Sequence, residues 1–439
     1  MRRQGDQPRG PEPVAYLCSA YPWFSHTFVL REVQALRRIG VDVHTFTVRE
    51  TPSERLLSQI DRSEAARTHH LLPTNAGVLS RSLLRLLGSR RGVRALVSAS
   101  RRAWSLRRPG ARGTLWQLFY LTEAVLLWAE CSRRSIRHIH AHFANVSSDV
   151  ALLAVALGTA QQPDAPWSWS FTMHGPAEFW NAAKHRLADK ASSARFVACI
   201  SEFARSQLMA LTLPTVWERF HVVHCGLDFN AYAQTDGRPA SEQLRVVTVG
   251  RLVPLKGQIL VVEMIRALRE RGLEVSAEII GEGPARSDLE QRIAQHSLAG
   301  LVTLSGAVGQ DVLPDHLRRA TVFVLPSFAE GVPVSAMEAM ALGVPVVASR
   351  IAGIPELIDD GVSGLLATPG RIDELVQATE RLLRDPALRG RIAAAGRETV
   401  AKAFDVTTES CKLAALFPGQ SVPNGLVPVR NADQNREGQ

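Results

Sequence analysis

The sequence predicts an α/β protein made of two domains, each with a parallel β-sheet covered by helices. Apolar strand-like runs alternate with helical patterns in both halves of the chain, which is typical of successive βα units. The 439 residues are too many for one ordinary domain. A polar, turn-rich stretch at 231–243 divides them nearly in half. A hydrophobic fraction of 46% is enough for two full cores.

The strand predictions follow from short apolar runs that end in turn residues. In the first half they fall at 14–19, 41–48, 137–142, 167–173 and 196–200, with a first helix at 28–39. In the second half they fall at 245–250, 274–281, 302–305, 322–325, 345–348 and 364–367, and residues 373–401 have a helical pattern. We therefore expect one domain over 14–234 and another over 235–402, with a flexible start at 1–13 and a disordered polar tail at 418–439.

Two cations follow the first strand of the second half. Arg251 and Lys256 lie in a strand-to-helix loop that ends at Gly257. Ligands of doubly wound sheets bind at this carboxyl edge. Arginine can bind a diphosphate in a fork and lysine supplies a point charge, so the loop is either an anion site or a solvated basic loop.

Two carboxylates follow the fourth strand of that half. Glu330 lies in a loop, and Glu338 lies about a turn and a half inside the next helix. Pro333 suits the first turn of this helix and Gly343 ends it. A helix N-terminus attracts phosphate and carboxylates accept hydrogen bonds from sugar hydroxyls. The pattern therefore favours a ligand that is both phosphorylated and polyhydroxylated.

These motifs together resemble a known family. Gly-Arg-Leu-x-x-x-Lys-Gly at 250–257 and Glu-Gly-x-Pro-x-x-x-x-Glu-Ala-Met-Ala at 330–341 are similar to the retaining glycosyltransferases of family 4, or group 1. Segments 21–32, 140–143, 171–175 and 199–202 resemble its colanic-acid type, exopolysaccharide-building branch. The resemblance covers residues 14–416. It implies the GT-B fold, in which two Rossmann-like β/α/β domains face each other across a cleft. It also implies that a last helix, here within 403–417, crosses back to the first domain.

The resemblance further implies roles for individual residues. Arg251 and Lys256 match positions that bind the donor diphosphate, Glu330 faces the donor sugar, and Glu338 holds the nucleotide ribose. The remaining donor contacts that it implies are Gly283, Gly306, Gly331, Val332 and Pro333. Because two cations and helix N-termini can neutralise a diphosphate, we expect no metal and no cofactor besides the nucleotide diphosphate sugar itself.

In the first half, His174 precedes a glycine at the end of a strand, where the family places a histidine near the donor sugar. The alternative is a structural histidine in a turn. Ser25, His26 and Thr27 lie in the first strand-to-helix loop, where the family approaches phosphate and acceptor, and His142 joins this acceptor side. Many relatives have glutamate in place of His26, so the role of this residue is open.

His138, His140 and His142 alternate and so share one face of a strand, a pattern that fits either a metal site or a plain strand. No acidic ligand lies near them in the sequence, and a plain strand explains the same period. Five scattered cysteines, at 18, 131, 199, 225 and 411, form no CxxC motif and indicate reduced, buried thiols. The chain starts without the apolar core of a signal peptide and contains no run long enough to span a bilayer. We expect a cytoplasmic protein, peripheral at the inner face of the plasma membrane.

The positive charge is concentrated in the first half. Residues 1–234 carry 29 Lys+Arg and 17 Asp+Glu, a net charge of +12, which leaves −3 of the total +9 for the rest. Arginines are dense at 81–112, at positions 81, 85, 90, 91, 94, 101, 102, 107, 108 and 112, and no carboxylate interrupts them. Apolar residues recur there at helical spacing, at 79, 83, 86 and 87 and at 93, 96, 97 and 104. The segment is either a helix on an anionic membrane surface or a domain helix with solvated arginines.

The function that we expect is transfer of a sugar from a nucleotide diphosphate sugar to a lipid-linked saccharide, in the synthesis of a bacterial exopolysaccharide or surface polysaccharide. One alternative is a transferase for a soluble or glycerolipid acceptor. Another is a non-catalytic nucleotide-sugar sensor or assembly partner. Nucleic-acid binding would fit the basic half, but no nucleic-acid module or aromatic-basic ladder supports it.

Overall fold

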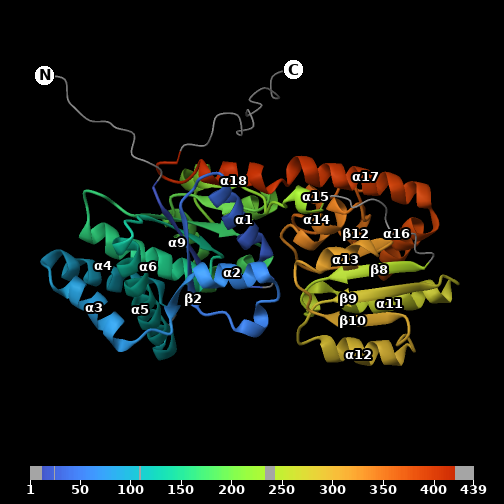
Figure 1. Ribbon diagram of the computed structural model, residues 1–439, viewed down its shortest axis with the longest axis horizontal. Coiled ribbons are helices and arrows are strands. Elements are labelled where there is room, and N and C mark those ends of the chain that lie inside the picture. Colours follow the sequence, from blue (N-terminus) through green and yellow to red (C-terminus); the bar gives the residue numbers. More distant parts are fainter. Residues whose placement is uncertain (1–11, 24, 108–109, 233–242, 421–439) are drawn as a thin grey trace, which may run out of the picture.

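The computed structural model describes residues 12–23, 25–107, 110–232 and 243–420. They form two parallel sheets, each flanked by helices, that lie side by side along the long axis (Figure 1). The boundary expected at 234, the first eleven residues and most of the polar tail lie outside the described residues.

The first sheet has the strand order β3-β2-β1-β4-β5-β6-β7, all parallel. The five predicted strands are present, and two short edge strands, β3 and β7, were missed because only one residue of each is buried and so no apolar run marks them. The strands are β1 (Val14–Ala20), β2 (Val43–Arg49), β3 (His69–Leu72), β4 (His138–His142), β5 (Ser168–Met173), β6 (Val197–Cys199) and β7 (Phe220–Val222). The helices are α1 (Thr27–Arg38), α2 (Gln59–Arg67), α3 (Ala76–Leu87), α4 (Arg90–Leu106), α5 (Ala111–Arg133), α6 (Val146–Gln161), α7 (Pro176–Trp180), α8 (Ala182–His185), α9 (Leu187–Ser193) and α10 (Glu202–Ala210).

The second sheet has the order β10-β9-β8-β11-β12-β13, again all parallel, and its six strands are the six predicted. They are β8 (Leu244–Val249), β9 (Val275–Ile280), β10 (Val302–Gly306), β11 (Val322–Leu325), β12 (Val346–Ser349) and β13 (Leu365–Ala367). The helices are α11 (Gln258–Glu270), α12 (Arg286–Gln295), α13 (Leu313–Arg318), α14 (Val334–Ala341), α15 (Ile354–Leu357), α16 (Ile372–Arg384), α17 (Pro386–Ala403) and α18 (Val406–Ala414). The predicted helix at 373–401 is two helices, because Asp385 has an extended backbone before Pro386 and caps α17.

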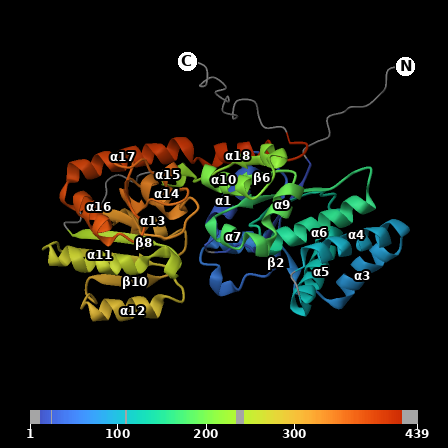
Figure 2. The same ribbon diagram turned by 180° about the vertical axis from the view of Figure 1, so that it is seen from behind.

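The last helix returns to the first domain. Helix α17 runs along the second domain and α18 continues over the first (Figures 1 and 2). Leu413, Ala414 and Phe417 share a core cluster with residues of β1 and α1, and Glu409 accepts a hydrogen bond from the backbone N–H of His224 at 2.8 Å. The C-terminal helix therefore ties the two domains together, as the resemblance implies.

The arginine-rich segment forms two helices and the start of a third at the outer end of the first domain. Helix α3 ends at Gly88, and Gly92 allows α4 to pack closely, since a Cβ there would lie 1.8 Å from the carbonyl oxygen of Leu86. The buried residues of α4 are Gly92, three alanines at 95, 99 and 103, and Leu106, whereas Val93, Val97 and Trp104 are exposed. None of the helices in the described residues is long and apolar enough to cross a bilayer.

Candidate active site between the two domains

A cavity of about 430 Å³ lies between the carboxyl ends of the two sheets. Both domains contribute to its walls. The second domain supplies the strand-to-helix loops around Arg251 and Glu330, and the first supplies the loops after β1, β4 and β5. This is the edge at which parallel sheets bind ligands.

The wall from the second domain is charged. Lys256 Nζ lies 2.6 Å from Glu330 Oε1, and Ser327 Oγ donates to the same oxygen at 2.7 Å. Arg251 is exposed on this wall. The turn depends on Gly257, which has a φ of +64° and whose Cβ would lie 2.2 Å from the carbonyl oxygen of Pro326. The cation loop and the carboxylate loop are thus packed against each other.

Glu338 lies deeper, on α14, and is held from the first domain. Its Oε1 accepts from Arg31 Nη2 at 2.6 Å and from the Tyr232 hydroxyl at 2.9 Å. The Glu338 side chain is 5% exposed and the Arg31 side chain 10%. Charge-assisted bonds in such a buried place are strong, so this contact connects the two domains directly.

The two walls of the cavity come close together at Gly331. A Cβ at this position would lie 2.4 Å from the carbonyl oxygen of His174 and 2.6 Å from Cδ1 of Ile200. A second contact joins the two domains nearby. The Glu356 carboxylate of α15 accepts hydrogen bonds from the backbone N–H of Glu202 at 2.7 Å and of Phe203 at 2.8 Å, at the start of α10. The carboxylate suits the positive end of that helix, and the two domains are closed on each other here.

The wall from the first domain is aromatic. The rings of His26, Phe28, Phe143 and His174 lie against one another with centroids 4.5–6.3 Å apart. Burial, and then the nearby charge of Arg251, lower the pKa of His26 to about 4. His26 is therefore a neutral imidazole at neutral pH, facing the cation of the opposite wall.

His174 is fixed by a chain of buried groups. His142 Nδ1 lies 2.9 Å from His174 Nε2, and His142 Nε2 lies 3.4 Å from Glu32 Oε1. The carboxylate favours a proton on Nε2 of His142, so its Nδ1 accepts from His174. His174 then has an unprotonated Nδ1, 3.9 Å from Cys225 Sγ. Burial lowers the pKa of His174 well below its usual value, so this histidine is also neutral.

Most of the predicted site residues meet at the cavity. Those that line it are Ser25, His26, Thr27, His174, Arg251, Lys256, Glu330, Gly331, Val332, Pro333 and Glu338. Placing His142 on the acceptor wall was wrong, because its side chain is fully buried behind His174. Gly283 and Gly306 do not line the cavity either, although their neighbours Glu282 and Ala307 do.

The expectation that no acid lies near the histidines of β4 was also wrong. Glu32, distant in sequence, offers an oxygen within 4.8 Å of ligand atoms on His140 and His142. Both ring nitrogens of His140 are, however, already hydrogen-bonded, to Ser170 Oγ at 2.8 Å and Thr172 Oγ1 at 2.9 Å. An ion here would have to displace one of these hydroxyls, so the arrangement fits a buried hydrogen-bond network better than a metal centre.

Sequence reasoning missed Arg31, Tyr232, Phe143, Glu178 and Trp180 as parts of the site. The last three line the cavity, and the first two hold Glu338. Arg31 lies inside the segment 21–32, and Phe143 ends the segment 140–143. Neither residue type indicates a binding role by itself, since charged residues are common on helices and aromatic residues are common after strands. Only the closed arrangement of the domains identifies them.

Part of the chain matches a known protein family. Residues 234–399 match the family described as "Glycosyl transferases group 1". The chain is 34% identical over 172 residues to the alpha-D-kanosaminyltransferase of Streptomyces kanamyceticus, which is 39% of this chain and 45% of that protein. It is 34% identical over 212 residues to the amylovoran biosynthesis glycosyltransferase AmsK of Erwinia amylovora, 47% of this chain and 52% of that one. The matched regions thus span about half the length of these relatives.

Solved structures show the same fold over nearly the whole chain. Anabaena HepE in complex with UDP superimposes with a TM-score of 0.67 at 18% identity, covering 92% of this chain and 98% of that one. Sucrose-phosphate synthase from Thermosynechococcus elongatus gives a TM-score of 0.68 at 20% identity, with the same coverage. Residues 234–399 therefore match a group 1 glycosyltransferase domain, and the chain has the GT-B fold.

Proposed function

We propose that the protein, whose residues 234–399 match the family "Glycosyl transferases group 1", is a retaining, metal-independent glycosyltransferase. It moves a sugar from a nucleotide diphosphate sugar to a lipid-linked saccharide, in the synthesis of an exopolysaccharide or surface polysaccharide. The observation that carries the proposal is the cavity that brings Arg251, Lys256, Glu330 and Glu338 to one wall. The UDP bound to HepE supports a nucleotide diphosphate sugar as the donor. The name of AmsK, an amylovoran biosynthesis glycosyltransferase, supports a role in polysaccharide synthesis.

The charged wall suits the departing group. The acceptor oxygen bonds to the anomeric carbon as the bond from that carbon to the diphosphate breaks, and the proton of the acceptor hydroxyl passes to the departing diphosphate. Negative charge grows on the diphosphate oxygens as the bond breaks. Arg251 and Lys256 neutralise that charge, and the N-terminus of α14 adds N–H groups and a positive dipole. Since the charge is already balanced by these groups, the proposed mechanism needs no metal ion.

The carboxylates position the donor. Glu330 accepts from hydroxyls of the donor sugar, and Glu338 accepts from the ribose through its Oε2, since Oε1 is engaged by Arg31 and Tyr232. Lys256 holds Glu330 in place at 2.6 Å before the donor arrives. His174, neutral and fixed by His142, lies against the donor sugar.

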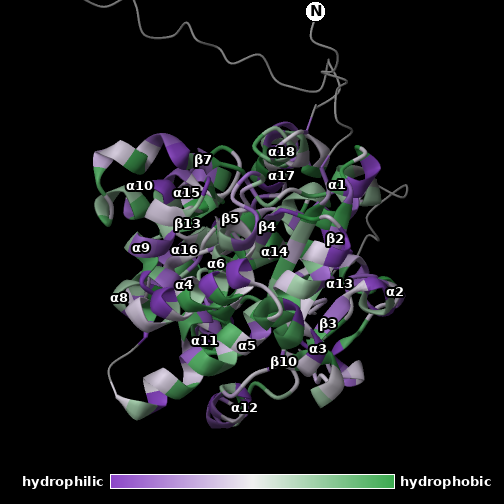
Figure 3. Ribbon diagram, turned by 90° about the vertical axis from the view of Figure 1, so that its left-hand side faces the viewer, coloured by the Kyte–Doolittle hydropathy of each residue, from purple (hydrophilic) through white to green (hydrophobic). Residues whose placement is uncertain are grey.

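The surface of α3 and α4 suits an anionic membrane, at the cytoplasmic side where lipid-linked acceptors are presented. Arg90, Arg91 and Arg101 are exposed. Val93, Val97 and Trp104 are also exposed, by 42%, 46% and 60%, because the alanine face of α4 packs inward. In contrast, Leu79, Leu83 and Leu86 of α3 pack on the core. Figure 3 shows hydrophobic and hydrophilic stretches side by side on these helices. This mixed basic and apolar surface supports the peripheral binding that we propose.

The experiment that tests the function is turnover of nucleotide sugars by the pure protein. A thermal-shift screen of UDP, GDP and ADP would identify the nucleotide, since a ligand of the folded state raises its stability. Slow hydrolysis of the matching nucleotide sugar should then follow, and should persist in EDTA. A nucleotide-sugar sensor would bind without turnover. Inversion at the anomeric carbon in the transferred product, or loss of activity on chelation with rescue by Mg²⁺, would contradict the proposal.

A further inference from the structure

Glu32 of α1 does not line the cavity, yet it begins a row of largely buried groups that reaches the cavity at His174. Its Oε1 accepts a hydrogen bond from the Tyr16 hydroxyl at 2.9 Å and lies 3.4 Å from His142 Nε2. Among the described residues, no hydroxyl or amide bonds to that nitrogen. The Glu32 carboxylate is therefore the group that decides whether His142 Nε2 carries a proton.

One direction of hydrogen bonding fits every member of this row. Burial raises the pKa of Tyr16 well above its usual value, so its hydroxyl keeps the proton that it donates to Glu32. A proton on Nε2 of His142 leaves its Nδ1 to accept from His174 Nε2 at 2.9 Å. At the far end, burial also raises the pKa of the Cys225 thiol, so its S–H remains and can donate to His174 Nδ1 at 3.9 Å. We call these five residues the histidine row.

The opposite direction is unfavourable. It would turn the lone pair of His142 Nε2 toward the Glu32 carboxylate, so that two acceptors face each other. In a buried place, where the effective dielectric constant is low, such a contact is costly. The carboxylate at one end of the histidine row therefore determines which nitrogen of His174, at the other end, carries the proton.

This direction uses both ring nitrogens of His174, because Nε2 donates to His142 and Nδ1 faces the Cys225 thiol. The ring is also stacked on that of His142, with centroids 5.2 Å apart and an angle of 24° between the planes. The backbone of His174 lies against the donor loop, since a Cβ at Gly331 would be 2.4 Å from its carbonyl oxygen. The histidine row thus fixes a ring that lies beside the contact between the two walls.

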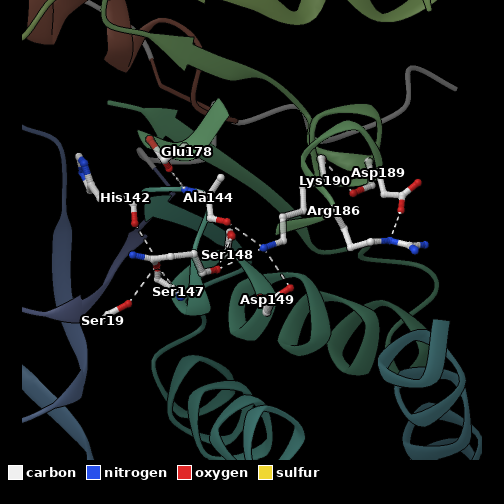
Figure 4. Close-up of polar contacts among 12 residues, drawn as sticks. Ser19, His142, Ala144, Ser147, Ser148, Asp149, Glu178, Arg186, Asp189 and Lys190 are labelled. Carbon is white, nitrogen blue, oxygen red and sulfur yellow. Dashed lines mark hydrogen bonds and ion pairs between the residues drawn. The ribbon is translucent and has the colours of Figure 1, made fainter. Parts of the chain in front are cut away.

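The backbone at both strand ends is held independently of Glu32 (Figure 4). Ser147 Oγ donates to the carbonyl of His142 at 2.6 Å. Glu178 accepts hydrogen bonds from the backbone N–H groups of Ala144 and His174 and so joins the ends of β4 and β5. Because these bonds fix the strands, loss of Glu32 would change the hydrogen bonding of the rings more than the position of the strands.

Helix α1 contacts the site at two consecutive residues. Arg31 reaches Glu338 of the second domain at 2.6 Å, and Glu32 lies against His142 of the first. Side chains of consecutive residues on a helix point about 100° apart, so one helix can serve both partners. The two contacts belong to different parts of the proposed donor site, the ribose carboxylate and the histidine beside the sugar.

We propose that Glu32 is a positioning residue of the transferase, which acts through His142 to hold His174 in the tautomer with its proton on Nε2. His174 then takes no part in proton transfer, because both of its ring nitrogens are engaged within the protein. Glu32 and Arg31 together make α1 the element that orders both ends of the donor. This inference rests on the proposed function and deepens it.

The direct test is ¹⁵N NMR of the full chain labelled at histidine, since the shift of a ring nitrogen reports whether it carries a proton. His142→Gln and His174→Gln assign the two sets of signals. In the wild type we expect the proton on Nε2 of both histidines. A proton on Nδ1 of His174 would overturn the proposal. This measurement needs no turnover, so it is decided separately from the proposed function.

Two variants then connect the tautomer with catalysis. Glu32→Gln keeps the shape of the side chain and removes its charge, and Glu32→Leu also removes the acceptor. In each we expect part of the His174 population to carry its proton on Nδ1. The kcat for hydrolysis of the donor found in the screen above should fall roughly three- to tenfold, the scale of one hydrogen bond. The donor KM should change little, because the charged wall and the Arg31–Glu338 pair are untouched.

Glu64 provides the matched control. Its carboxylate is 4% exposed and pairs with Arg37 of the same helix at 2.7 Å, but it does not line the cavity. The same two substitutions at Glu64 should leave both the histidine tautomers and kcat unchanged. Unchanged tautomers in the Glu32 variants, or an equal fall of kcat in the Glu64 variants, would refute the role of Glu32. If Glu32→Leu does not fold, Glu32→Gln decides. Absence of hydrolysis by the wild type would count against the proposed function instead.

Discussion

Arg31 Nη2 of the first domain lies 2.6 Å from Glu338 Oε1 of the second, and both side chains are almost fully buried. Tyr232 donates to the same oxygen at 2.9 Å. One oxygen of the proposed ribose carboxylate is therefore fixed across the domain interface. Closure of the domains and orientation of Glu338 are coupled through this pair.

We predict that Arg31→Met weakens binding of the nucleoside diphosphate about ten- to a hundredfold, because a charge-assisted hydrogen bond contributes roughly 1.5–3 kcal/mol. Calorimetric titration measures the effect, and Arg31→Lys should recover part of it. Binding of inorganic pyrophosphate, which has no ribose, should change little. Arg38→Met on the same helix removes an exposed pair with Asp228 and is the matched control. Equal losses in the Arg31 and Arg38 variants would show that the pair has no special role.

We predict that Arg251→Ala and Lys256→Ala each reduce donor binding and turnover roughly ten- to a hundredfold, because each leaves diphosphate charge less neutralised. Glu330→Gln should mainly reduce turnover, and it also releases Lys256 from its 2.6 Å contact. Steady-state kinetics with varied donor concentration separates the loss of donor binding from the loss of turnover. Lys402→Ala, which removes an exposed lysine paired with Glu398, serves as the control. Wild-type rates in all three site variants would mean that the donor binds elsewhere.

Glu178 should make folding stability depend on pH. Burial, partly offset by the backbone hydrogen bonds from Ala144 and His174, raises the pKa of Glu178 to about 7 from the ordinary 4.5. Because this pKa is higher in the folded state than in the unfolded state, the folded state binds the proton more tightly than the unfolded state does. The stability from this proton is full below about pH 4.5 and is lost as pH rises through about 7.

The measurement is urea unfolding of wild type and Glu178→Gln between pH 5 and 8. As the pH rises over this interval, we expect the free energy of unfolding of the wild type to fall by about 1–3 kcal/mol relative to that of the variant. This range follows from roughly 1.4 kcal/mol per pKa unit. Burial also raises the pKa of Glu123 to about 7. Glu123 is present in both proteins, so only the effect of Glu178 differs between them. A constant difference across the pH range would show that Glu178 is not protonated near neutrality.

We predict salt-sensitive binding to liposomes that contain anionic lipid and none to neutral liposomes. Each arginine near such a surface contributes ~1 kcal/mol, screened by salt. Replacing Arg90, Arg91, Arg101 and Arg102 with Gln should abolish the binding and leave donor binding intact. The control removes equal charge from the second domain, at Arg271, Arg371, Arg384 and Lys402. Equal sedimentation of wild type and the first variant would exclude α4 from membrane binding.

The sequence predicted all six strands of the second sheet, because buried parallel strands are continuous apolar runs bounded by turns. It missed β3 and β7, whose few residues become strands only by pairing with β2 and β6. It also joined α16 and α17, although Pro386 marks the break. Local pattern was thus sufficient for buried apolar strands, but not for the half-buried edge strands or for two helices that meet at a proline.

The sequence by itself determined the class of the fold and placed Arg251, Lys256, Glu330 and Glu338 on the charged wall at the carboxyl edge of the second sheet, because each belongs to the loop or helix that follows a predicted strand. The tertiary structure alone decided what faces that wall. Arg31 reaches Glu338 across 307 positions of chain, and Phe143 meets His26 only where separate loops converge. Contacts between distant segments depend on how the sheets pack and how the domains close, and no local periodicity records that packing.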